Sequence, residues 1–155
     1  MRDDRTHQFI HSRGYARFAL SQIFNQDPLK IPLNAQPNKP PELPLDYGYI
    51  SLSHCSDMLV VAWSMKKLGI DVERADRNIF GLKNFKKLFS DDFKSNDLNI
   101  SNDEILRSQI LDLWVLKESL VKWENSSIFY GLHNWKISKR DNLAINIKSE
   151  LNVRI

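Results

Sequence analysis

Apolar side chains recur at helical spacing near the beginning of the chain. The apolar positions of residues 6–25 that fit this spacing are Phe9, Ile10, Phe18, Ala19, Ile23 and Phe24. Side chains three or four residues apart share one face of an α-helix. The pattern therefore predicts an amphipathic helix over about residues 6–25, in which Gly14 is the one weak position.

All six prolines follow this helix, within residues 28–44. Proline is excluded from helix interiors and from central strands, so this proline-rich segment is expected to be extended or turning. Three strand-like runs with two short connections come next. The runs are residues 47–53, 58–65 and 68–73, and the connections between them are residues 54–57 and 66–67. They predict an antiparallel meander.

Helical spacing then returns twice. Residues 79–89 and residues 103–123 both carry apolar positions three and four residues apart. The polar residues 90–102 between them are expected to form a loop or a broken helix. The second half of the chain thus predicts two helices, of which the later one is longer.

The last part of the chain reads as strands. Residues 134–137 and 143–147 are strand-like and flank a turn at residues 139–142. Helix, strands, helices and strands in this order predict an α+β fold. We expect two small α+β halves of similar plan, residues 1–66 and residues 67–155.

Charge and cysteine content narrow the class of protein. Lys and Arg number 22 against 19 Asp and Glu, an excess too small to favour nucleic acid as a partner. Cys55 is the only cysteine, which excludes an internal disulfide and a Cys-rich zinc site and favours the cytoplasm. The longest apolar run, residues 58–63, is far too short to span a membrane, and no export signal is expected. A monomer is expected.

Two carboxylates, Asp71 and Glu73, alternate with apolar residues in the run at residues 69–73. On a strand these carboxylates would share one face, while the apolar residues between them face the core. Two carboxylates at that separation repel each other unless a cation or solvent relieves the repulsion. The pattern fits a metal site, but taken alone it is better explained by a solvated face with Arg74 as counter-ion, because surface carboxylates are common and metal sites rare.

The long helix carries a second candidate constellation. Its apolar stripe consists of Leu106, Ile110, Leu113, Trp114, Leu120 and Val121. Lys117 falls in the middle of this stripe, where its ammonium group must reach an anion. Glu118 and Lys122 lie beside the stripe, four residues apart. Taken alone, that pair is explained by a helix-stabilising salt bridge worth about 0.3–0.5 kcal/mol.

Hydroxyl and imidazole groups gather at residues 51–54 (SLSH), near a chain reversal. They could bind an anion or form an ordinary polar turn. Ser53 and His54 are neighbours, and neighbouring side chains of a strand point to opposite faces, so a hydrolase dyad is not expected.

Three segments, in this order, resemble the signatures of the 4′-phosphopantetheinyl transferase family, of the surfactin-synthetase-activating type. They are residues 50–54 (ISLSH), 69–73 (GIDVE) and 114–122 (WVLKESLVK). Upstream, residues 38–40 (NKP) resemble the family's Gly-Lys-Pro motif with Asn38 in place of glycine, and residues 9–14 (FIHSRG) resemble the beginning of its arginine-bearing first helix. The resemblance spans about residues 5–137.

The resemblance implies Mg²⁺-dependent transfer of the phosphopantetheine arm of coenzyme A to a serine of an apo acyl or peptidyl carrier protein. It implies a pseudo-two-fold α+β fold and release of 3′,5′-adenosine bisphosphate. Asp71, Glu73 and Glu118 would hold Mg²⁺, whose preference for oxygen ligands they satisfy. Glu118 and Lys122 would be catalytic, with Glu118 as base directly or through water. The groups from both halves that would hold coenzyme A are Arg13, Lys39, Ser53, His54 and Lys117.

A non-catalytic binding module is the alternative. The chain begins almost at its first helix and ends soon after residue 147, whereas family members of this type continue through further strands. The sequence therefore also fits a protein that keeps the fold and holds carrier proteins or nucleotides without turnover.

Overall fold

The computed structural model describes residues 2–36, 39–56, 58–78, 89, 92, 102–138 and 141–155. The chain divides into two compact units, Met1–Ile70 and Asp71–Ile155. Several predicted features lie wholly or largely outside the described residues. They are Asn38, Asp57, the helix at residues 79–89, the loop at residues 90–102 and residues 139–140 of the last turn.

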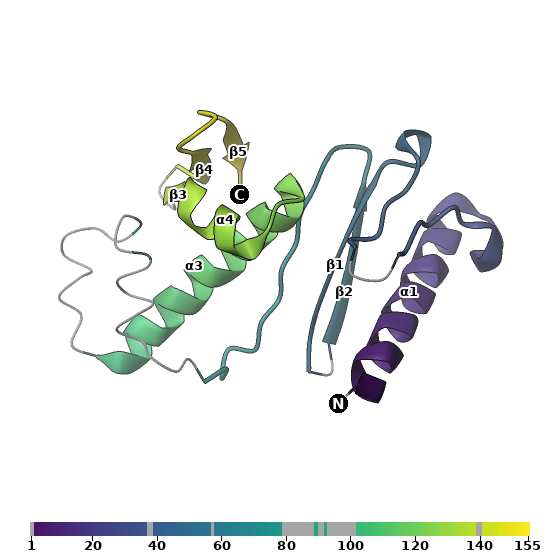
Figure 1. The fold of residues 1–155 in the computed structure, drawn as a ribbon, viewed down its shortest axis with the longest axis horizontal. Coiled ribbons are helices and arrows are strands. Elements are labelled where there is room, and N and C mark those ends of the chain that lie inside the picture. Colours follow the sequence, from purple (N-terminus) through teal and green to yellow (C-terminus); the bar gives the residue numbers. More distant parts are fainter. Residues whose placement is uncertain are drawn as a thin grey trace. The chain divides into compact units, whose positions relative to one another are not determined.

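The first unit combines one long helix with a β-hairpin (Figure 1). Its elements are the helix α1 (Arg2–Phe24), the 3₁₀ helices η1 (Pro28–Lys30) and η2 (Leu45–Tyr47), and the strands β1 (Tyr49–Cys55) and β2 (Met58–Ser64). The strands are antiparallel, with Ser51 opposite Ala62. The first predicted helix and the first two predicted strands are thereby confirmed. The predicted apolar face of the helix is wrong, because Ile10, Phe18 and Ile23 are exposed and the helix is buried through Ala16 and Leu20.

The hairpin turn is shorter than predicted. β1 includes His54 and Cys55, which pair with Leu59 and Met58 across the hairpin. Ser56, the first turn residue, has φ 46°, and positive φ at this position matches the twist of the flanking strands. Residues 54 and 55 therefore belong to the strand and not to the connection at residues 54–57.

The third predicted strand, residues 68–73, is wrong. The structure assigns no strand to these residues, and β1 and β2 form a two-stranded sheet. The Ile70 backbone N–H donates to the Ser51 Oγ at 3.1 Å, so a side chain takes the bond that a neighbouring strand would take. Asp71 and Glu73 therefore do not lie on a strand face.

The core of the first unit joins the helix, the proline-rich segment and β1. Its buried residues are Ala16, Leu20, Ile31, Leu33 and Ile50. Arg17 of α1 donates to the carbonyl oxygens of Ile31 and Leu33 at 2.5 and 2.8 Å. The backbones of Asn34 and Glu42 exchange two hydrogen bonds of 2.9 Å. The segment is extended and turning, as predicted, and the helix holds it in place.

In its described residues, the second unit combines two helices with a three-stranded antiparallel sheet. Its elements are α3 (Asp103–Glu124), α4 (Ile128–Asn134), β3 (Trp135–Ser138), β4 (Leu143–Asn146) and β5 (Asn152–Arg154). The long helix and two of these strands were predicted, while α4 and β5 were not. Asn102 begins α3 by accepting from the backbone N–H groups of Glu104 and Ile105, and Asn125 ends it in the left-handed conformation. Helices with antiparallel strands make the fold α+β.

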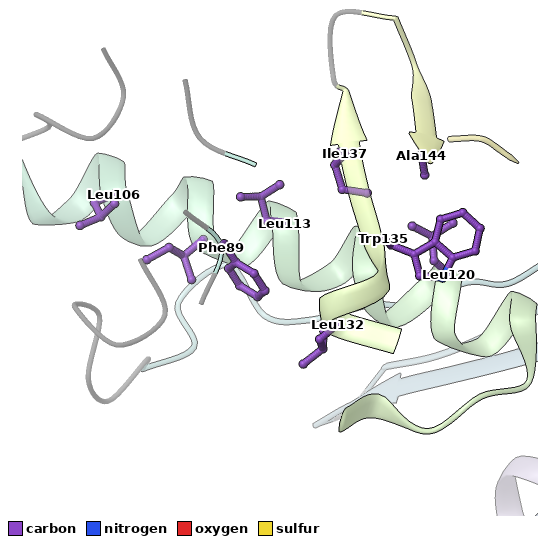
Figure 2. Packing of buried hydrophobic residues seen from close by; sticks show 9 residues of the cluster. Phe89, Leu106, Leu113, Leu120, Leu132, Trp135, Ile137 and Ala144 are labelled. Atoms are coloured by element: carbon purple, nitrogen blue, oxygen red, sulfur yellow. The ribbon is translucent and has the colours of Figure 1, made fainter. Parts of the chain in front are cut away.

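One face of α3 packs against α4, β3 and β4 in the core of the second unit (Figure 2). The buried members are Phe89, Leu106, Ile110, Leu113, Leu120, Leu132, Trp135, Ile137 and Ala144. At Gly131 a Cβ atom would lie 2.2 Å from Val121 Cγ2, so only glycine lets α4 approach α3 this closely. None of the helices in the described ranges is both long enough and apolar enough to cross a membrane.

Candidate active site

Asp71 meets the long helix at Lys122. The Lys122 Nζ lies 2.6 Å from Asp71 Oδ1, although the two residues are 51 positions apart. The Asp71 side chain is 8% exposed and that of Lys122 is 29% exposed. A charged pair with so little exposure interacts more strongly than a surface pair. The structure thereby joins the motif at residues 69–73 to the motif at residues 114–122.

Glu73 forms an ion pair with a different residue, Arg77. The Arg77 guanidinium forms an ion pair with the Glu73 carboxylate and lies 5.6 Å from the centroid of the Trp114 ring. Arg74, the expected counter-ion, instead donates twice to Asp76, at 2.6 and 2.7 Å. The acidic motif is thus neutralised by Lys122 and Arg77.

Glu118 is half-buried beside these groups. Burial raises the pKa of the Glu118 carboxyl, and the negative charges of Asp71 and Glu73 raise it further. Lys122 and Arg77 act in the opposite direction on the same pKa. The four other charged groups therefore lie within electrostatic range of Glu118, and the five together are called the charged cluster below.

The donor set has the chemistry that a hard divalent cation requires. Carboxylate oxygens are the protein ligands that Mg²⁺ prefers. Burial is the first cause of the raised pKa of Glu118, and the negative charges of Asp71 and Glu73 add to it. Among the described residues, however, no three His, Cys, Asp or Glu side chains lie close enough to hold a metal ion as they stand. The charges fit a cation, and the side chains of Asp71 and Glu73 are turned to Lys122 and Arg77.

Lys117 belongs to the core of the second unit. Its Nζ lies 2.6 Å from Asp92 Oδ2 and donates to the carbonyl oxygens of Leu132 and Trp135 at 3.0 and 2.7 Å. The Lys117 and Asp92 side chains are 4% and 2% exposed. The anion expected for this lysine is therefore Asp92, and the ammonium does not face solvent, where a phosphate could reach it.

Two of the residues expected to hold coenzyme A meet in the first unit. Arg13 Nη2 donates to the backbone oxygen of Lys39 at 3.4 Å, and the guanidinium lies 4.5 Å from the centroid of the Phe9 ring. Burial lowers the pKa of Arg13. Its Nε is buried and has no acceptor among the described residues. A buried donor without an acceptor fits an anion-binding role.

Ser53 and His54 occupy opposite faces of β1, as expected for neighbours on a strand. Ser53 is 3% exposed, whereas His54 is exposed. The Lys39 side chain is exposed as well. Of the three residues, Lys39 and His54 are those that a ligand can reach from solvent.

The comparisons with known proteins agree with this geometry. The family model of the 4′-phosphopantetheinyl transferase superfamily matches residues 67–153, more than half of the chain. This chain belongs to that superfamily. A 4′-phosphopantetheinyl transferase of Bacillus subtilis is 24% identical over 133 residues. The match covers 85% of the present chain and 58% of the relative, so the chain spans little more than half of that protein's length.

The superfamily match includes the residues proposed to hold the metal and to take part in catalysis. Asp71, Glu73, Glu118 and Lys122 all lie within residues 67–153. Arg13, Lys39, Ser53 and His54 lie upstream of the matched residues, and their assignment depends on the motif resemblance alone. The charged residues of the second unit and the candidate coenzyme A ligands of the first unit therefore need separate experiments.

Sequence reasoning missed three residues of this phosphopantetheinyl transferase superfamily member. Arg77 is four residues after Glu73, a spacing that could have suggested a partner. Arg17 is one helical turn after Arg13, on the side of α1 that meets the proline-rich segment. Asp92 carries no local signal, because it stands in a polar run and its partner Lys117 is distant in sequence.

We expect the Glu118→Gln variant to melt about 1–2 °C higher than the wild type at pH 7 without metal. Because the folded-state pKa of Glu118 is raised above its ordinary value of 4.5, the folded protein holds this proton more tightly than the unfolded chain does. The contribution of Glu118 to folding stability is therefore fully present below pH 4.5 and is lost as the pH rises through the folded-state pKa of Glu118. Glutamine does not ionise and avoids the loss.

Thermal melts in EDTA between pH 4 and pH 8 measure this difference. The gain should shrink as the pH falls toward 4.5, the ordinary glutamate value. Glu104→Gln is the matched control, since Glu104 is exposed in the first turn of the same helix. A Glu118→Gln protein that melts lower than the wild type at pH 7 would contradict the electrostatic account.

Proposed function

We propose that this protein is a Mg²⁺-dependent 4′-phosphopantetheinyl transferase of the surfactin-synthetase-activating type. It would transfer the phosphopantetheine arm of coenzyme A to a serine of an apo acyl or peptidyl carrier protein. The observation that carries the proposal is the ion pair between Asp71 and Lys122, with Glu118 in electrostatic range of both. Membership of the superfamily supports it.

Asp71, Glu73 and Glu118 are the residues that would hold Mg²⁺. The ion, when bound, supplies positive charge to the pyrophosphate oxygens of coenzyme A. Phosphoryl transfer requires mainly positioning and charge neutralisation from the protein. Asp71 and Glu118 are presented by different parts of the second unit, and α3 is a long helix that holds Glu118 and Lys122 one turn apart.

The reaction would use Lys122 and, directly or through a water molecule, Glu118. The serine oxygen of the carrier protein forms a bond to the phosphorus that bears the pantetheine arm, and the bond to 3′,5′-adenosine bisphosphate breaks. Glu118 accepts the serine proton, and a carboxylate with a raised pKa is the stronger base. Lys122 stabilises the oxygens on which negative charge grows.

Coenzyme A would also need cationic and polar groups from the first unit. The residues proposed for this role are Arg13, Lys39, Ser53 and His54. Arg13 supports the proposal through its unpaired buried Nε. Lys117 is left out of the set, because its ammonium group is buried against Asp92.

We expect Lys39→Ala and His54→Ala each to weaken coenzyme A binding about ten-fold. Charge-assisted contacts to phosphate contribute roughly 1.5–3 kcal/mol, and both side chains are exposed and available. Isothermal titration calorimetry with coenzyme A measures the change. Lys30→Ala is the matched control, since Lys30 is an exposed lysine of the same unit in η1. Unchanged affinity in both variants would remove the first-unit residues from the site.

The proposed activity is tested by incubating the protein with coenzyme A, Mg²⁺ and an apo carrier protein. Mass spectrometry of the carrier should show one added phosphopantetheine arm, and omission of Mg²⁺ should prevent the addition. Acyl and peptidyl carrier proteins are tried in parallel. No added arm on any carrier overturns the transferase and leaves the non-catalytic binding module, which coenzyme A calorimetry then detects.

The proposal also includes the location, the oligomeric state and the symmetry of the protein. The protein would act in the cytoplasm as a monomer. Each unit holds a long helix and antiparallel strands, which supports a pseudo-two-fold fold in which both halves repeat one α+β plan.

A further inference from the structure

Arg77 is held in the charged cluster by two independent contacts. Its guanidinium pairs with the Glu73 carboxylate and lies over the Trp114 ring, 5.6 Å from the ring centroid. Trp114 is partly buried and packs against the core of the second unit. The contact with Trp114 therefore ties Arg77 to α3, whether or not Glu73 is engaged elsewhere.

The neighbouring arginine makes a useful contrast. Arg74 donates two hydrogen bonds to Asp76, and both side chains are largely exposed. Arg77 pairs with Glu73, a proposed metal ligand, and lies over Trp114 of α3, whereas Arg74 pairs with Asp76. Arg77 is therefore the arginine that links a proposed metal ligand to α3.

We propose that Arg77 is a cationic member of the active site that exchanges partners. Without metal, it balances the charge of Glu73. When Glu73 takes a divalent cation, the guanidinium stays on Trp114 and binds the pyrophosphate of the substrate. This inference rests on the proposed function, because it takes the metal and the pyrophosphate from it.

The exchange follows from the charges. Asp71, Glu73 and Glu118 carry three negative charges, which Lys122 and Arg77 balance only in part. A divalent cation that binds Glu73 must displace the guanidinium, and positive charges then repel each other unless an anion arrives. A guanidinium has several N–H donors in one plane and binds phosphate oxygens in pairs, so the displaced Arg77 is suited to that anion.

Metal binding by the whole protein without substrate provides the first test. Mn²⁺ is the probe, because it accepts the carboxylate ligands of Mg²⁺ and its free form is counted by electron paramagnetic resonance. Arg77→Met should bind Mn²⁺ about two- to five-fold more tightly than the wild type, since an ion pair worth up to about 1 kcal/mol no longer competes. Methionine keeps an apolar stem on Trp114. Arg74→Met removes the same charge three residues away and should leave Mn²⁺ affinity unchanged.

Coenzyme A binding at saturating Mg²⁺ provides the second test, with the opposite sign. Arg77→Met should weaken coenzyme A about ten-fold, and Arg74→Met should not. Arg77 is 43% exposed, so both variants should melt within a degree or two of the wild type. Arg77→Lys keeps the charge and loses the paired donors, and should recover only part of the affinity.

The outcomes separate the inference from the proposed function. Equal Mn²⁺ affinity in wild type and Arg77→Met, or no Mn²⁺ binding at all, overturns the exchange. Tighter Mn²⁺ with unchanged coenzyme A affinity overturns the role at the pyrophosphate. A wild-type protein that binds Mn²⁺ but neither binds coenzyme A nor modifies a carrier overturns the proposed function, while the Mn²⁺ comparison still decides whether Arg77 competes with the metal.

Discussion

Replacing Asp71 with alanine is expected to lower the rate of phosphopantetheine transfer by about three orders of magnitude. The carboxylate is both a proposed metal ligand and the partner of Lys122 at 2.6 Å. A bound metal contributes several kcal/mol to transition-state stabilisation, and each 1.4 kcal/mol is about ten-fold in rate. Lys122 would also lose the contact that orients it beside Glu118.

The fold should survive this change. Asp71 is not part of the apolar core of the second unit, and the Lys122 side chain is 29% exposed, so water can solvate its ammonium group. Asp76→Ala is the matched control, because Asp76 is an exposed carboxylate of the same segment whose contacts are with Arg74. The carrier-modification rate and the melting temperature are measured for both variants. A fully active Asp71→Ala protein would refute the site.

Replacing Lys117 with methionine is expected to lower the free energy of unfolding by about 3–5 kcal/mol. The variant leaves the Asp92 carboxylate buried without its cation and leaves the carbonyl oxygens of Leu132 and Trp135 without this donor. A loss of this size is a large part of the 5–15 kcal/mol that stabilises a typical domain. Urea unfolding followed by circular dichroism measures the change.

A second variant separates the cost of leaving a buried charge unpaired from the cost of losing the packing of the lysine side chain. Lys117→Met combined with Asp92→Leu removes both charges and should recover most of the lost stability, since apolar pairs replace buried ion pairs well. Some loss should remain, because the Ile137 N–H donates to Asp92 Oδ1 at 2.8 Å. Lys136→Met, at an exposed position of β3, is the control and should change stability by less than about 0.5 kcal/mol.

The same double variant decides between two hypotheses for Lys117. The motif resemblance made it a ligand of coenzyme A, whereas the structure places it on Asp92. A folded double variant with wild-type affinity for coenzyme A supports the structural role. If its affinity falls ten-fold while that of the Lys136→Met control stays the same, Lys117 contacts the ligand after all.

Long periodic segments were the most predictable parts of the fold. The spacing of apolar residues located α1 and α3, because a helix repeats its own geometry along many residues. The spacing gave the buried face of α3 but not that of α1, whose Ile10, Phe18 and Ile23 are exposed. The run at residues 68–73 was misread as a strand, since alternation is a local pattern but a strand exists only where a second strand pairs with it. The short helix α4 contains Gly131, which lowers helix propensity and leaves room for Val121 of α3.

The sequence by itself determined which side chains are proposed to carry the chemistry, and it placed Asp71, Glu118 and Lys122 in motifs that resemble those of the family. It also showed that Lys117 needs an anion, because a lysine inside an apolar stripe must be neutralised. Only the tertiary structure decided that the anion is Asp92, that Lys122 reaches Asp71 and that Arg77 lies on Trp114. The direction of a side chain follows from local backbone geometry, whereas its partner is set by packing between residues far apart in the chain.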